Sequence, residues 1–150
     1  MNAKNLLPTD ALLFVAQLAA LRPPPASIWL IGSRANGRYR VDSDTDLLVF
    51  ADQDFASAAR ASLAPPANID VLVVHDGDHY ADIWQQKTGS LRALRWSMDG
   101  PTRATYVGLK FVPDQDEERS SPLLAAGPAT QLGEMFELNE FALRIWPDDG

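Results

Sequence analysis

Residues 31–38 read Ile-Gly-Ser-Arg-Ala-Asn-Gly-Arg, and residues 43–48 read Ser-Asp-Thr-Asp-Leu-Leu. The first stretch begins where the apolar segment 27–31 ends, and the second leads into the apolar segment 46–50. Short apolar segments bounded by glycine or polar residues are typical of buried strands. We therefore expect a strand, a glycine-serine turn, a polar loop and a second strand, with polar side chains gathered at the strand ends.

The glycine-serine turn has the properties of an anion-binding site. Gly32 and Ser33 follow a strand and precede a predicted helical turn, which presents backbone N–H groups and a helix N-terminus to an anion. The hydroxyl of Ser33 can also donate to a phosphate oxygen. Arg34, Arg38 and Arg40 add positive charge beside the turn, with Arg34 the best placed of the three. Gly32, Ser33, Arg34 and Arg38 are the predicted phosphate-binding residues.

Three aspartates form the second half of the predicted site. Asp44 and Asp46 stand two residues apart at the start of a strand, so their side chains project from the same face. Asp70 follows Ile69 at the start of a third apolar strand, and it joins the other two if the strands are neighbours. Adjacent carboxylates repel each other unless a proton or a cation lies between them. Asp44, Asp46 and Asp70 are therefore the predicted metal ligands and catalytic residues.

The composition restricts which metal these residues can bind. The chain has no cysteine and only two histidines, His75 and His79, so thiolate and histidine-rich sites are excluded. Oxygen ligands suit hard cations, and we expect Mg²⁺ or Mn²⁺. Three carboxylates can hold two such ions, one at the attacking oxygen and one at the leaving group.

Taken together, these motifs resemble the DNA polymerase beta-like nucleotidyltransferase superfamily and, within it, the minimal nucleotidyltransferases. The shared pattern is Gly32-Ser33, then Asp44-Thr45-Asp46, then Asp70, with the Arg-Ala-Asn-Gly segment at residues 34–37. It covers about residues 10–75. The resemblance implies a nucleotidyltransferase fold, two Mg²⁺ ions on the three aspartates and a nucleoside triphosphate, expected to be ATP, on Gly32-Ser33. It also implies that Asp70 is the base for an acceptor hydroxyl and that pyrophosphate is released.

The remaining pattern predicts an α/β (α+β) domain, with a mixed β-sheet flanked by helices. Thr9 and Asp10 can cap a helix over 11–21, and Asp52 or Asp54 can cap another that runs to about Leu63. The apolar segment 69–74 predicts the third strand.

Beyond residue 76 the pattern is less decisive. Residues 78–87 predict a helix that stops at Gly89, and residues 103–111 alternate as in a strand. In that strand Tyr106, Gly108 and Lys110 share one face. The turn at 99–101 joins the strand to residues 94–98, which fit a strand or a helix. Residues 131–146 fit a helix or a strand equally well.

The net charge of −7 lies entirely in the last quarter of the chain. Residues 1–112 carry 11 acidic and 11 basic side chains, whereas residues 113–150 carry 9 acidic and 2 basic. We predict a nucleotidyltransferase domain over 1–112 and an acidic C-terminal extension over 113–150, which packs on the same domain or on a partner. Nucleic acid is not the expected partner, because binding to phosphate backbones needs clustered lysine and arginine. Without an apolar run of ~18 residues or a basic-then-apolar leader, we expect a cytoplasmic protein and no membrane.

The predicted function is the metal-dependent transfer of a nucleoside monophosphate to a hydroxyl. Small stand-alone members of the resembled family are similar to the antitoxins of toxin-antitoxin modules. The resemblance therefore implies a toxin-like protein as acceptor and partner, which the acidic extension would contact. The alternatives are a small-molecule acceptor, as in aminoglycoside nucleotidyltransferases, and a non-catalytic partner-binding module on the same fold.

Overall fold

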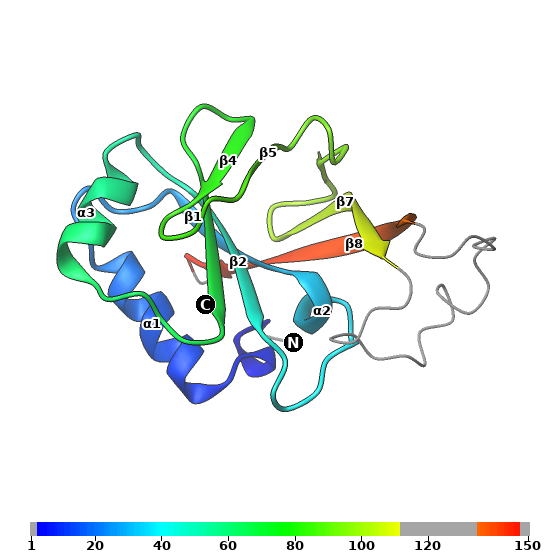
Figure 1. Cartoon of the computed structure of the whole chain (residues 1–150), viewed down its shortest axis with the longest axis horizontal. Helices are drawn as coiled ribbons and strands as arrows, with labels where there is room; N and C mark the ends of the chain where they lie inside the picture. The colour runs from blue at the N-terminus through cyan, green and yellow to red at the C-terminus, as the bar shows by residue number, and fades with distance from the viewer. Residues whose placement is uncertain (1–2, 112–134, 148–150) are drawn as a thin grey trace.

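The computed structural model describes residues 3–111 and 135–147. Its centre is one eight-stranded mixed sheet in the order β5-β4-β3-β2-β1-β8-β7-β6 (Figure 1). The pair β2–β3 is parallel, and the other neighbouring pairs are antiparallel. The strands are β1 (Ser27–Ile31), β2 (Thr45–Phe50), β3 (Ile69–Val74), β4 (His79–Asp82), β5 (Thr88–Ser90), β6 (Ser97–Met98), β7 (Arg103–Phe111) and β8 (Met135–Trp146).

In the part of the chain that the structure describes, the helices are few and short. They are the 3-10 helix η1 (Ala3–Leu6) and the α-helices α1 (Thr9–Ala19), α2 (Gly32–Ala35) and α3 (Phe55–Ser62). Figure 1 shows α1 and α3 side by side, whereas the single turn α2 lies apart from them, at the end of β1. α1 begins at Thr9 after the N-cap Pro8, so the predicted caps Thr9 and Asp10 lie inside the helix, where Oδ1 of Asp10 accepts a hydrogen bond from the N–H of Ala11 at 2.9 Å. Asp54 is the N-cap of α3 but makes no side-chain cap hydrogen bond, whereas Oδ1 of Asp52 accepts a hydrogen bond from the N–H of Asp54 at 3.1 Å. The mixed sheet with flanking helices confirms the predicted fold class.

The alternation of side chains along the central strands builds two separate apolar clusters. One cluster contains α1 and α3 together with every second residue of β1, β2 and β3, such as Leu30, Leu47 and Val71. The other contains the intervening residues, such as Trp29 and Leu48, and no residue of α1 or α3. By the same alternation, Asp46 and Asp70 belong to this second face, which the two longer helices leave uncovered.

The prediction of a helix over residues 78–87 is wrong. These residues form β4, a turn and the approach to β5. Asp82 makes the turn, because its Oδ1 accepts hydrogen bonds from the backbone N–H groups of Trp84 and Gln85 at 2.8 and 2.9 Å. Aspartate favours such local bonds over a helix interior. Gly89, predicted as a helix stop, instead pairs with Tyr80 across the β4–β5 ladder.

Two later segments whose sequence pattern fitted either a helix or a strand form strands in the structure. Residues 97 and 98 form β6, which makes a hairpin with β7 as the turn at 99–101 predicts. Residues 135–146 form β8, which lies between β1 and β7. This part of the predicted acidic extension is therefore an inner strand of the sheet, while residues 112–134 and 148–150 lie outside the described residues.

Within the described residues, no helix has the length and apolar character needed to cross a membrane.

Candidate active site

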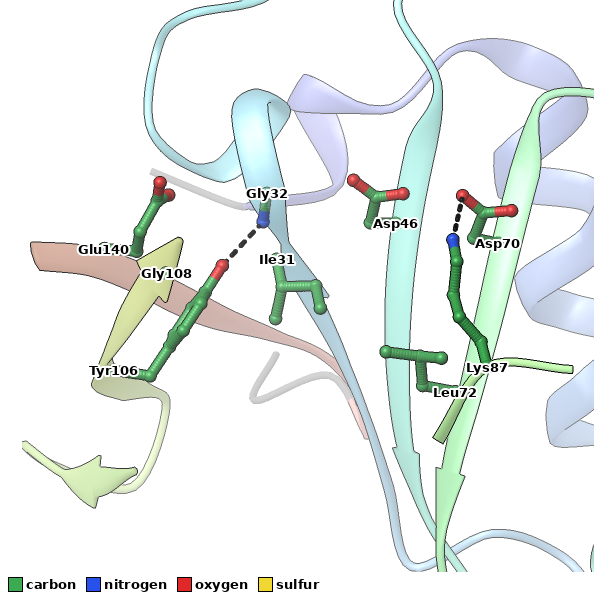
Figure 2. A pocket seen from close by; sticks show the side chains of 9 residues that line it. All are labelled: Ile31, Gly32, Asp46, Asp70, Leu72, Lys87, Tyr106, Gly108 and Glu140. Atoms are coloured by element: carbon green, nitrogen blue, oxygen red, sulfur yellow. Dashed lines mark hydrogen bonds and ion pairs between the residues drawn. The ribbon is translucent and has the colours of Figure 1, made fainter. Parts of the chain in front are cut away.

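The parallel pairing of β2 and β3 brings two of the three predicted aspartates together. Asp46 and Asp70 are direct partners in the ladder, one residue after Thr45 and Ile69. Partners on neighbouring strands project to the same face of a sheet. Both carboxylates therefore point to the face without α1 and α3, and Figure 2 shows them next to each other, near the starts of their strands.

Gly32 closes the site on the other side of Asp46. Its neighbour Ile31 pairs with Asp46 across the β1–β2 ladder, and Gly32 then turns away with a φ of +76°. A β-carbon on Gly32 would lie 3.2 Å from Cγ of Asp46 and would collide with its Oδ2. Glycine is required here both for the backbone angle and for the space that the carboxylate occupies.

Tyr106 holds the start of the turn in place. Its hydroxyl accepts a hydrogen bond from the backbone N–H of Gly32 at 2.9 Å, across 74 residues of sequence. The side chain is buried, and burial, together with the charge of Glu140, raises the pKa of the phenol, which stays neutral. This N–H group was predicted to face a phosphate, but in the structure it binds Tyr106.

These groups line a hollow of about 220 Å³ on the sheet face without α1 and α3 (Figure 2). Its walls combine charged side chains with apolar ones, as is usual for ligand sites. The lining residues are Ile31, Gly32, Asp46, Asp70, Leu72, Lys87, Tyr106, Gly108 and Glu140.

The carboxylates in the hollow repel each other. Burial, followed by the charge of Asp70 and a side-chain hydrogen bond with it, raises the pKa of Asp46 to about 7. The charge of Asp44 raises this pKa further, and the ammonium group of Lys87 lowers it. Asp46 therefore holds a proton at pH values at which an ordinary aspartate is ionised, until a cation replaces that proton.

This repulsion predicts how the stability of the metal-free protein depends on pH. The folded pKa of Asp46 lies above the value of 3.8 expected in the unfolded chain. The contribution of Asp46 to the free energy of unfolding is therefore fully present below pH 4 and is lost as the pH rises to about 7. Asp46→Asn removes this dependence. As the pH rises from 4 to about 7, the free energy of unfolding of the variant should therefore increase relative to that of the wild type by a few kcal/mol.

Urea unfolding of both proteins in a chelator, at intervals from pH 4 to pH 8, measures this difference. A difference that stays constant across the range would show that Asp46 does not titrate abnormally.

The residues fit a divalent cation, although they do not form a complete protein cage. Among the described residues, no group of three histidine, cysteine, aspartate or glutamate side chains is close enough to hold a metal ion. Asp44 is exposed and does not line the hollow, but its charge reaches Asp46. Mg²⁺ typically binds to one or two carboxylates together with water and substrate phosphates. The pair of Asp46 and Asp70 matches this ligand set.

The other predicted phosphate-binding residues are not among those lining the hollow. Ser33 is buried at the start of α2. Arg34 is also buried, and its guanidinium donates to backbone carbonyls of Leu6, Arg40, Val41 and Ser43 at 3.0–3.4 Å. Its role in the structure is to hold the loop that leads to Asp44.

Arg38 forms an ion pair with Glu140 on β8, next to the hollow. The pair is largely removed from solvent, with side-chain exposures of 11% for Arg38 and 2% for Glu140. Asn36 makes a second contact with β8. Its Oδ1 accepts a hydrogen bond from the backbone N–H of Phe141 at 2.7 Å, and its Nδ2 donates to the Phe141 carbonyl at 3.1 Å. The segment after the glycine-serine turn is thus fixed to β8.

Four polar or glycine positions of the hollow were not predicted as site residues: Lys87, Tyr106, Gly108 and Glu140. The sequence did contain a signal for two of them, since the alternation over 103–111 places Tyr106 and Gly108 on one face. Lys87 was assigned to a helix that does not form, and Glu140 lies in the segment whose pattern fitted a helix or a strand.

Comparison with protein families shows what kind of domain carries this site. Residues 14–118 match the model of the nucleotidyltransferase domain, which is well over half of the chain. Corresponding searches of the curated proteins and of the solved structures give no match. The matched residues include the glycine-serine turn and all three aspartates. The chain belongs to the nucleotidyltransferase domain family.

Proposed function

We propose that this protein transfers a nucleoside monophosphate from a nucleoside triphosphate, expected to be ATP, to a hydroxyl group and releases pyrophosphate. The observation that carries the proposal is the alignment of Asp46 and Asp70 on adjacent parallel strands, directly beside Gly32. The pair of carboxylates offers a place for the cations that nucleotidyl transfer needs, and the hollow beside it, which Lys87 also lines, offers room for the phosphates.

Asp46 and Asp70 would hold Mg²⁺ or Mn²⁺, with Asp44 contributing negative charge from the loop before β2. When bound, the cation neutralises phosphate charge and polarises the reacting oxygens. Gly32 leaves room for the Asp46 carboxylate close to the turn. Tyr106 fixes that turn through the N–H of Gly32. The protein residues thus supply a rigid frame in which little has to rearrange during the reaction.

Asp70 is the proposed base. Its carboxylate accepts the proton of the acceptor hydroxyl as that oxygen bonds to the α-phosphorus and the bond to the pyrophosphate oxygen breaks. The Asp70 side chain lines the hollow and is 23% exposed to solvent. A base in this position can meet an acceptor that arrives from solvent.

We propose that the acceptor is a hydroxyl of a partner protein, as in an antitoxin that modifies its toxin. Support comes from the charge distribution of residues 113–150, which carry 9 acidic and 2 basic side chains. Glu140 is buried against Arg38, and the remaining acidic excess would favour a basic protein surface. A small-molecule acceptor and a contact-only module are the competing functions.

Two labelled donors test the proposal. Purified protein, Mg²⁺ and extract of the organism that encodes it are mixed with ATP labelled at either the α- or the γ-phosphate. The proposal predicts stable labelling of a protein by the α-label alone. Labelling from the γ-phosphate would indicate a kinase and overturn the proposal, whereas α-label in a small-molecule fraction would assign a small acceptor. Absence of both labels would favour a contact-only module.

A further inference from the structure

Asp70 is contacted by two donors from the segment between β4 and β5. Nε2 of Gln85 donates to Oδ1 of Asp70 at 2.9 Å, and Nζ of Lys87 lies 3.7 Å from Oδ2. Figure 2 shows the Lys87 side chain extending past Leu72 to reach this carboxylate. Gln85 and Lys87 thus contact both carboxylate oxygens of Asp70.

The ion pair between Lys87 and Asp70 can break and re-form at little cost. The Lys87 side chain is 54% exposed, and exposed ion pairs contribute little to stability. The backbone of Lys87, by contrast, is fixed, because its carbonyl accepts a hydrogen bond from the N–H of Asp82 at 2.9 Å and its N–H donates to Gln85 at 3.0 Å. The ammonium group can therefore move while its attachment point stays beside the hollow.

We propose that Lys87 is an exchangeable cation of this site: it neutralises Asp70 when no metal is bound, and it is released to the triphosphate when metal occupies the carboxylates. The inference rests on the proposed function, and it assigns to Lys87 a role in both states. Among the described side chains that line the hollow, Lys87 alone carries positive charge.

Electrostatics gives the direction of the exchange. A divalent cation on Asp70 would repel an ammonium group a few ångströms away, so that the two cannot share the carboxylate. A triphosphate that arrives with the metal brings several negative charges within reach of the same side chain. Lys87 thus competes with the metal before the nucleotide binds and assists the nucleotide afterwards.

The exchange predicts that Lys87→Met changes the affinity for Mn²⁺ and the affinity for a nucleotide in opposite directions. Titration calorimetry measures Mn²⁺ binding without nucleotide, and then the binding of a non-hydrolysable ATP analogue at saturating Mn²⁺. Lys87→Met should tighten Mn²⁺ binding by about threefold, the scale of an exposed ion pair. The same variant should weaken analogue binding by about tenfold, the scale of a charged hydrogen bond. Neither readout depends on turnover.

Two further variants make the comparison specific. Lys87→Arg keeps the positive charge and should stay within about twofold of the wild type for Mn²⁺. Lys4→Met makes the same chemical change in η1, none of whose residues lines the hollow, and should leave both affinities unchanged. Circular dichroism melting confirms that each variant is folded.

The outcomes separate this inference from the function on which it rests. Wild-type protein that binds Mn²⁺ and the analogue, with Lys87→Met binding both as the wild type does, would overturn the exchange and leave the proposed function standing. A loss of both affinities in Lys87→Met would also overturn it, because that result indicates a purely structural role. Wild-type protein that binds neither Mn²⁺ nor the analogue would overturn both proposals.

Discussion

Replacing Asp46 by asparagine is expected to lower the rate of nucleotidyl transfer by at least about 10³-fold, while the metal-free protein becomes more stable. Asparagine has nearly the same shape but cannot ionise, so the site keeps only one of the two aligned carboxylates that would bind a cation. Metal ions stabilise transition-state charge by several kcal/mol, and each 1.4 kcal/mol corresponds to a factor of ten in rate. The rate of α-label transfer from ATP measures the effect.

Asp42→Asn is the matched control for this variant. Asp42 lies in the loop before β2, is 77% exposed and has its carboxylate 3.8 Å from Arg40. The same chemical change at this position should leave both rate and stability close to those of the wild type. Equal losses of activity in the two variants would mean that general charge, and not the pair in the hollow, determines the rate.

Gly32→Ala is expected to destabilise the protein by about 3 kcal/mol and to lower transfer by roughly 10²-fold. A φ of +76° is unfavourable for alanine, as for any L-residue with a β-carbon, by about 1–2 kcal/mol. The added methyl group would also displace the carboxylate of Asp46. Small misplacements of reacting groups have effects of roughly this size on rate. Urea unfolding and the α-label assay provide the two measurements.

Gly37→Ala separates the two contributions. Gly37 has almost the same backbone angle, with a φ of +74°, but a β-carbon there would meet nothing within 4 Å. Gly37→Ala should be destabilised only by the unfavourable backbone angle, by about 1 kcal/mol, and should keep most of its transfer activity. If Gly32→Ala is no worse than Gly37→Ala, the close approach of Gly32 to Asp46 has no functional importance.

The centre of the fold could be predicted because its sequence signals are local. The segment 69–74 is apolar apart from Asp70, and the segment 46–50 is apolar apart from Asp46. Each aspartate therefore marks the start of its strand, and in the structure each is the second residue of that strand. Once the two strands pair in parallel, the alignment of the carboxylates follows from the pleat.

The opposite wall of the hollow could not be predicted, because long-range pairing positions it. Tyr106 reaches Gly32 only because β8 lies between β1 and β7, and no local pattern in the sequence reveals this strand order. The pairing of Arg38 with Glu140 depends on the same arrangement. Proximity to the glycine-serine turn in the sequence thus predicted a phosphate contact for Arg38, whereas the structure gives it a carboxylate.

Lys87 was missed for a different reason. Its spacing from Tyr80 and Ile83 resembles a helical stripe. However, Asp76 just before this segment and Asp82 within it accept hydrogen bonds from backbone N–H groups and form turns instead. The apolar Ile83 is buried in the cluster with α1 and α3, which fixes the turn that carries Lys87 towards Asp70.

The measurement that tests the central claim most directly is a thermal shift with ATP, GTP, CTP and UTP, each with and without Mg²⁺, on the wild type and Asp46→Asn. It needs no acceptor. A triphosphate at ~100 times its dissociation constant contributes about 2.7 kcal/mol, or roughly 5–10 °C for a domain of this size. We predict such a shift for at least one triphosphate, only with Mg²⁺ and only in the wild type. No shift with any triphosphate, or an equal shift in Asp46→Asn, would contradict a metal-dependent nucleotide site at Asp46 and Asp70.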